Sequence, residues 1–210
     1  MGNLFNLIIN LNAKCDTMSV NLIKTIQENL GLPPLKKIDP NTQQPATDKD
    51  EDAVNKFSQA AIPAICTGLY SFVQTDEGAA EFLNIKTSTN WVGKIFDDNR
   101  KEAIQKISAY AEQSNEDVVA KINEIANEVV KVAKQNLPAN AGIKEVKDFF
   151  SGQVMDIVLY LPTELKMGEL LHDNTLDDNT NKMEGPVSTL IKNIGAAFSN
   201  PVTGEELKEK

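Results

Sequence analysis

The sequence predicts an all-α protein: a compact multi-helix array with a kinked central apolar helix and an N-terminal helical arm. Apolar residues recur at intervals of three and four along most of the chain, which is the spacing of one helix face. No segment alternates apolar and polar residues for long, and no hairpin dipeptide separates two β-rich runs. Together these observations favour packed helices over a sheet.

The predicted arm is the first segment with helical spacing. We assign residues 18–31 to this N-terminal helix, which Ser19 can cap and Gly31 can close. A helix of about 12 residues is not stable alone in water, so its apolar stripe must be covered by its own domain, a second copy or a partner. The candidate interaction arm consists of Leu22, Ile23, Ile26 and Leu30.

The predicted linker follows the arm, over residues 32–49. It contains Pro33, Pro34, Pro40 and Pro45. Four prolines rule out a continuous helix and favour an extended connector. Residues 1–17 lack helical caps and a clean apolar stripe, so we expect them to be disordered or untranslated, with Met18 as an alternative start.

The helical domain is predicted to span residues 50–199, and 200–210 to be a disordered tail. Its central helix begins at the acids "DED", which suit a helix N-terminus. Apolar residues then follow helical spacing, and residues 60–70 are almost all small or apolar, which is typical of a fully buried helix. Pro63 predicts a kink or a split. The stripe consists of Val54, Phe57, Ala61, Ile65, Leu69 and Phe72.

Capping residues delimit the helices that follow. Thr75 or Asp76 is expected to cap "EGAAEFL", and Ser88 or Thr89 to cap "NWVGKIF". A helix in "NRKEAIQKISAYAEQ" precedes a long one opened by the capping sequence at Ser114. The expected apolar stripe of the long helix consists of Val118, Ile122, Ile125, Val129, Val132 and Ala133. Separate helices are then expected in "IKEVKDFF", "VMDIVLYL", "TELKMGELL" and "GPVSTLIKNIGAAF".

Charge and composition argue against several classes of function. The net charge is −9, and Arg100 is the only arginine, so nucleic acid is a poor partner. No apolar run approaches the roughly 20 residues of a membrane span. With no signal peptide recognised, we expect a cytoplasmic protein. Cys15 and Cys66 have no CxxC neighbour, and Cys66 is expected to be a small buried hydrophobe.

The most polar segment is "LHDNTLDDNTNKMEGP", residues 171–186. Its oxygen ligands have nearly the spacing of an EF-hand loop, but Asp178 stands where the sharp turn needs glycine. We therefore favour an Asx-rich turn over a weak cation site. The weak candidate metal ligands are Asp173, Asp177, Asn179 and Glu184.

His172 is the only histidine, and no GxSxG motif surrounds any serine. We expect His172 to close a helix end rather than to act in catalysis. No phosphate-binding glycine motif is present. The sequence therefore gives no catalytic residues and no cofactor.

Several stretches resemble the bacterial YidB-like family, domain of unknown function 937 (DUF937). They are "MSVNLIKTIQENLG", "DAVNKFSQAAIPAICTGL", "DEGAAEFL", "WVGKIFDDNRKEAIQKIS" and "MGELLHDNTLDDNTNKMEGPVSTL". The resemblance spans about residues 18–198. The chain departs from the family in its proline-rich linker and in "AEQSNED", where the family has a glycine-rich turn. The resemblance implies a compact, helical, non-enzymatic protein.

Two functions are expected from these observations. The first is a non-enzymatic protein-interaction or structural module that acts on an unknown partner protein or by self-association. The alternative is a module that binds a small apolar or lipidic ligand between its helices. A dry cavity beside the central helix would favour the ligand, and a well-packed core with an apolar outer patch would favour the interaction.

Overall fold

The computed structural model describes residues 20–38, 52–85 and 89–172, and every regular element in these ranges is a helix. The all-α prediction is confirmed. In chain order the elements are α1 (Leu22–Asn29), α2 (Ala53–Val73), α3 (Asp76–Asn84), α4 (Trp91–Phe96), η1 (Asp97–Asn99), α5 (Arg100–Ala111), α6 (Asn115–Asn136), α7 (Ile143–Tyr160), η2 (Thr163–Leu165) and α8 (Met167–Leu170).

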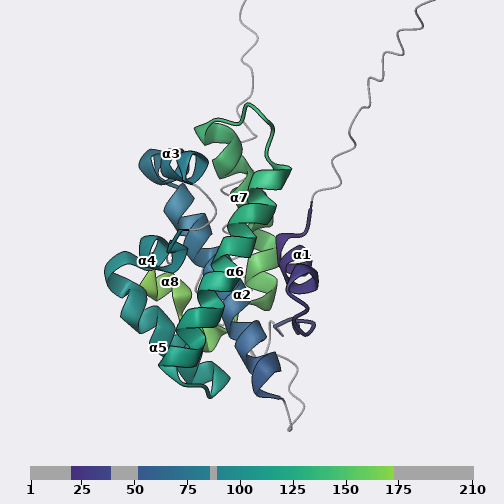
Figure 1. The fold of residues 1–210 in the computed structure, drawn as a ribbon, viewed down its shortest axis with the longest axis vertical. Coiled ribbons are helices and arrows are strands. Elements are labelled where there is room, and N and C mark those ends of the chain that lie inside the picture. Colours follow the sequence, from purple (N-terminus) through teal and green to yellow (C-terminus); the bar gives the residue numbers. More distant parts are fainter. Residues whose placement is uncertain (1–19, 39–51, 86–88, 173–210) are drawn as a thin grey trace, which may run out of the picture.

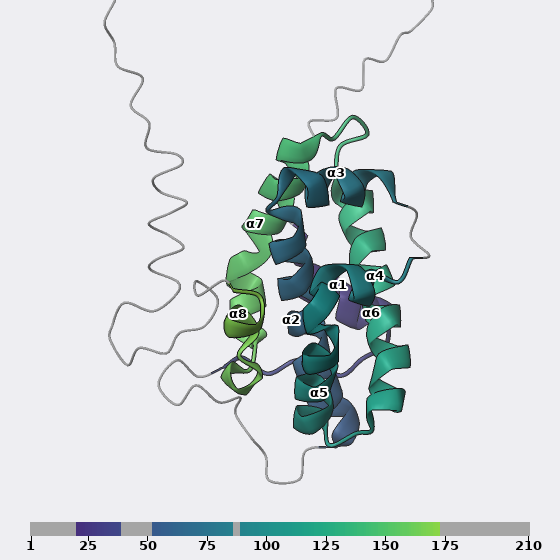
Figure 2. The same ribbon diagram turned by 90° about the vertical axis from the view of Figure 1, so that its left-hand side faces the viewer.

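Helix α2 is the centre of the array. Figure 2 shows it running between α7 on one side and α6 on the other. Every residue from Phe57 to Leu69 is buried, so the prediction of a central apolar helix is confirmed. The helix continues through Pro63, although this proline leaves the carbonyl of Gln59 without its helical donor. The alternative in which Pro63 splits the helix is therefore wrong.

Helices α3 and α4 surround an aromatic cluster. The ring of Trp91 lies 5.9 Å from that of Phe82 and 6.2 Å from that of Phe72 between centroids. Trp91 is fully buried, as a core residue. Thr75 caps α3 as predicted, because its side chain accepts a hydrogen bond from Gly78 N. The cap of α4 was predicted wrongly, since Asn90 supplies it.

Helix α6 begins at the predicted cap. The Ser114 side chain accepts a hydrogen bond of 3.2 Å from Asp117 N. This bond satisfies one of the free N–H groups at the helix start. The predicted apolar stripe is buried along the whole helix, and its members are Val118, Ile122, Ile125, Val129, Val132 and Ala133.

The C-terminal helices differ from the prediction in two places. "IKEVKDFF" and "VMDIVLYL" form one helix, α7, because the single glycine between them, Gly152, is only mildly unfavourable in a helix with a buried face. The segment "TELKMGELL" is divided into η2 and α8. The division falls at Lys166, whose backbone is left-handed with φ 45° and cannot continue a right-handed helix.

The N-terminal segment, residues 20–38, packs on the bundle of its own chain, which is one of the three ways of covering its apolar stripe that the sequence left open. Figure 1 shows α1 at the edge of the bundle, where it contacts α2, α6 and α7. Leu22, Ile23 and Ile26 are buried there. In addition, Leu22 N donates a hydrogen bond of 2.9 Å to Gln153 Oε1 on α7. The buried side chain of Gln153 thus accepts a hydrogen bond from a backbone N–H that the first turn of a helix leaves without a partner.

The first seven residues of the predicted linker also belong to the folded unit. Lys36 N donates to Gln59 Oε1 at 2.7 Å, and Gln59 Nε2 donates to Lys36 O at 3.0 Å. Ile38 N donates to Leu159 O on α7 at 2.9 Å. Hydrogen bonds of this kind allow an extended backbone to lie against a protein surface. Residues 39–49 of the predicted linker lie outside the described residues.

Candidate interaction groove

A surface groove lies where α1, the first turns of α2 and the first half of α6 meet. Its cavity volume is about 240 Å³. Its lining combines aliphatic and aromatic side chains with an amide and one residue of each charge. The lining residues are Leu30, Leu32, Val54, Phe57, Gln113, Lys121, Glu124 and Ile125.

One wall of the groove is the turn that ends α1. Gly31 adopts φ 61°, a conformation that glycine reaches without steric cost. Gly31 N donates to Glu28 O, and Leu32 N donates to Gln27 O. This Schellman pair reverses the chain. It thereby places Leu30 and Leu32 on the same side of the groove.

The opposite wall is the connection between α5 and α6, which is fastened to the start of α2. Gln113 Nε2 donates to Ala53 O at 3.0 Å, and Lys121 Nζ donates to Gln113 Oε1 at 2.9 Å. Lys56 Nζ lies 2.5 Å from Glu112 Oε1. Two of these contacts join the connection to the start of α2, and the third joins it to α6, so the wall is held in place by both helices.

The floor of the groove is apolar and its rim is charged. Phe57 and Ile125 are buried and form the floor. The ammonium of Lys121 lies 5.3 Å from the centroid of the Phe57 ring, within cation–π range. Glu124 is exposed at the rim. Val54, in contrast to Phe57, is 45% exposed, so apolar surface faces solvent at this end of α2.

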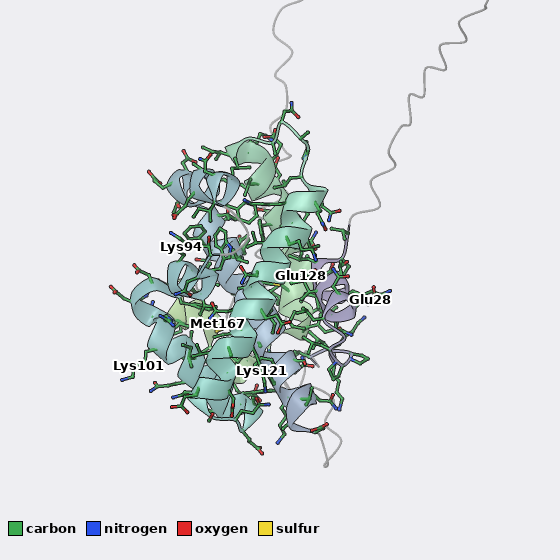
Figure 3. All side chains as sticks on the ribbon, in the orientation of Figure 1. Glu28, Lys94, Lys101, Lys121, Glu128 and Met167 are labelled. Atoms are coloured by element: carbon green, nitrogen blue, oxygen red, sulfur yellow. The ribbon has the colours of Figure 1, made fainter. Side chains whose placement is uncertain are left out.

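Figure 3 places Lys121 near the lower end of α6 and Glu128 farther up the same helix, toward α1. Asn29 Nδ2 donates to Glu128 Oε1 at 2.7 Å and ties the end of α1 to α6. Glu128 also pairs with Lys131 at 3.0 Å. Glu128 is therefore engaged by Asn29 and Lys131, while Lys121 and Glu124 border the groove itself.

The structure distributes the candidate interaction residues between the core and the groove. Leu22, Ile23 and Ile26 are covered by the chain's own helices and offer no apolar surface to a partner. Leu30 is half-buried and lines the groove. Of the four candidate interaction residues, only Leu30 therefore belongs to the groove.

The candidate cation loop begins directly after His172, where the described part of the chain ends. Asp173, Asp177, Asn179 and Glu184 lie outside the described residues. Within residues 20–38, 52–85 and 89–172, no three acidic, histidine or cysteine side chains gather as ligands for a metal ion. His172 follows the end of α8 and is exposed, with its backbone N donating to Glu169 O at 3.3 Å.

Cys66 lies in the buried part of α2, as predicted. Burial raises the pKa of its thiol, because the apolar surroundings disfavour the thiolate. A neutral, buried thiol is a poor nucleophile and a poor metal ligand. Cys66 therefore acts as a core residue.

Sequence reasoning missed most of the groove. Gln113, Lys121 and Glu124 read as ordinary polar residues of a solvated helix and its connection, and nothing in their spacing links them to α1. The one available signal was Val54. It is an apolar residue in the first turn of a helix, where side chains are often exposed, so it was a candidate for apolar surface.

The comparisons with known proteins give no relative. No protein-family model, no curated protein and no solved structure matches the chain. The resemblance to DUF937 therefore stays a prediction. No helix among the described residues combines the length and the apolar character needed to cross a membrane.

Proposed function

We propose that this protein is a non-enzymatic interaction module that binds a short helical segment of a partner protein in the groove between α1, α2 and α6. One observation carries the proposal: the groove exposes apolar surface at Val54, next to the buried side chains of Phe57 and Ile125. Apolar side chains of a partner would remove this surface from water, which is the main driving force of most protein association.

The size of the groove supports a peptide over an enclosed small molecule. Its volume of about 240 Å³ lies below the roughly 300–1,000 Å³ that is usual for ligand pockets. A groove of this size suits one or two apolar side chains, which a helix presents at positions i and i+3 or i+4. Lys121 and Glu124 at the rim would favour a partner helix with opposite charges beside its apolar residues.

A small apolar or lipidic ligand is the second candidate. The specific feature that favours it is the ammonium of Lys121 above the Phe57 ring. An apolar chain on the floor, with a carboxylate paired to Lys121, would use both parts of the site. Dodecanoate is a suitable probe for this alternative.

The test is a selection of helical peptides from a random library on the full chain, followed by affinity measurements on variants. Val54→Asp places a charge in the groove, and it should fold because an acid suits the first turn of a helix. Binding of the selected peptides should weaken at least about tenfold, which corresponds to about 1.4 kcal/mol. Met155→Asp makes the same kind of change at an exposed site on α7 and should leave binding unchanged.

Peptides that bind both variants equally, or a library that yields no binder, would overturn the proposal. Saturable binding of dodecanoate that is lost in Lys121→Gln, without any peptide binder, would favour the ligand alternative instead. The melting temperature of each variant shows whether it has kept its fold.

A further inference from the structure

A second apolar surface lies on α7, away from the groove. Only three large apolar side chains of the described residues are exposed, and two of them, Met155 (39%) and Leu159 (36%), are on this helix. They are four residues apart and share one face. Gly152 lies on the same face and is exposed. We call the surface formed by Gly152, Met155 and Leu159 the α7 strip.

The α7 strip is open enough for another helix to pack on it. A methyl group added at Gly152 would meet no atom within 4 Å, so the surface is open at this point and another backbone can approach closely. Half-buried Val158 borders the strip and packs against Val154, which widens the apolar surface toward α2. Toward the start of α7, the strip ends at Asp148, which forms an ion pair with Lys144.

The C-terminal part of the sequence contains an apolar stripe that could cover the α7 strip. Residues 186–198 lie outside the described residues, but their sequence has the pattern of an amphipathic helix. Pro186 suits the first turn of a helix. Apolar residues follow at relative positions i, i+3, i+4, i+7 and i+11, which is the stripe of an amphipathic helix. They are Val187, Leu190, Ile191, Ile194 and Phe198.

The connecting chain is long enough to bring this stripe to α7. The described chain ends at His172, and the 13 residues 173–185 separate it from Pro186. Extended, 13 residues span at most about 43–47 Å. Helix α7, with 18 residues, is only about 27 Å long. Fully extended, the connecting chain is therefore longer than α7 itself.

We propose that residues 186–198 dock as an amphipathic helix on the α7 strip of the same chain. A five-residue stripe needs an elongated apolar surface, and the strip runs along a helix axis. The groove accepts fewer side chains and is the weaker match. The docked helix would cover Met155 and Leu159, and it would leave the groove free for a partner.

Hydrogen exchange of the full chain tests the docking. Backbone amides of residues 186–198 should exchange at least about tenfold more slowly than in the isolated peptide, because docking holds them in helical hydrogen bonds. Met155→Asp should return their exchange to within about twofold of the free peptide. Val54→Asp, which alters the groove, is the matched control and should leave the protection unchanged.

Cross-linking identifies the occupant of the strip. Met155→Cys and Ile191→Cys are combined in a Cys15→Ser background, where the remaining Cys66 is buried. A short bismaleimide should join the two new thiols within one chain, and the pair Val54→Cys with Ile191→Cys should remain unlinked. Peptide mapping by mass spectrometry locates the link.

Three results would overturn the proposal. The first is exchange of residues 186–198 at the free-peptide rate in the wild-type chain. The second is protection that survives Met155→Asp but is lost in Val54→Asp, which would place the segment in the groove. The third is a cross-link that forms only between two chains, which would make a second copy the occupant.

Discussion

Replacement of Gln59 should release the N-terminal segment from the bundle and destabilise the fold. Gln59 is buried in the first half of α2. Its Nε2 donates to Lys36 O at 3.0 Å and to Tyr160 O at 2.7 Å, while its Oε1 accepts from Lys36 N at 2.7 Å. One amide thus joins α2 to the extended residues 32–38 and to the end of α7.

The magnitude follows from these three hydrogen bonds. Gln59→Leu keeps the side chain close to its original size and removes all three. A hydrogen bond contributes about 0.5–1.5 kcal/mol net, and each buried backbone group left unpaired costs about 1–3 kcal/mol. The partner groups are only partly buried, so water would compensate for some of the loss. We therefore expect the free energy of unfolding to fall by about 2–4 kcal/mol.

Urea unfolding followed by circular dichroism at 222 nm measures this loss. Gln27→Leu is the control, because Gln27 Oε1 accepts a single weak bond of 3.3 Å from Leu35 N, and its replacement should cost no more than about 1 kcal/mol. Hydrogen exchange at residues 32–38 should accelerate in Gln59→Leu. A loss below about 0.5 kcal/mol, the range of ordinary surface changes, with unchanged exchange would refute the reasoning.

Three further outcomes are expected. Ile65→Ala should lower the free energy of unfolding by about 2–5 kcal/mol through lost transfer energy and a cavity, since Ile65 is fully buried; a surface-like cost in urea unfolding would contradict this. In a Cys15→Ser chain, the buried Cys66 should react with a thiol reagent only after denaturation. Rapid labelling of the native protein would show that solvent reaches the buried part of α2. The pKa of Glu145 is lowered, first by its hydrogen bond from Gly142 N. The contribution of Glu145 to stability should therefore be fully present when the pH is above the ordinary carboxyl pKa. It should disappear as the pH falls through the lowered pKa of Glu145 in the folded protein. The stability difference between wild type and Glu145→Gln should shrink in acid, and a difference independent of pH would refute this.

The helices with strong apolar periodicity were the predictable part of the fold. In α6 every member of the expected stripe is buried, and Ser114 caps the helix at the expected residue. Helix α2 is central because its composition leaves it no polar face. Such features depend on residues a few positions apart, which is the range over which local sequence determines a helix.

The path of the N-terminal segment was not predictable in the same way. Its docking depends on polar pairs between distant residues: Lys36 with Gln59, and Leu22 with Gln153, which is 131 positions away. Buried glutamines look like any other polar residue in a sequence. Four prolines in the following stretch favoured a free connector, yet an extended backbone needs only suitable hydrogen-bond partners to lie on the bundle.

The candidate sites escaped prediction for a related reason. Val54 and Phe57 belong to one apolar stripe, but Phe57 is buried and Val54 is 45% exposed, because the cover provided by α6 and the α1 turn ends between them. On α7, Ile157 is buried while Met155 and Leu159 face outward. Periodicity predicts which face of a helix is apolar, but tertiary packing decides how much of that face is covered. Our two proposals assign the uncovered remainder to a partner at the groove and to the chain's own C-terminal segment on α7, and the matched pair Val54→Asp and Met155→Asp tests the two surfaces independently.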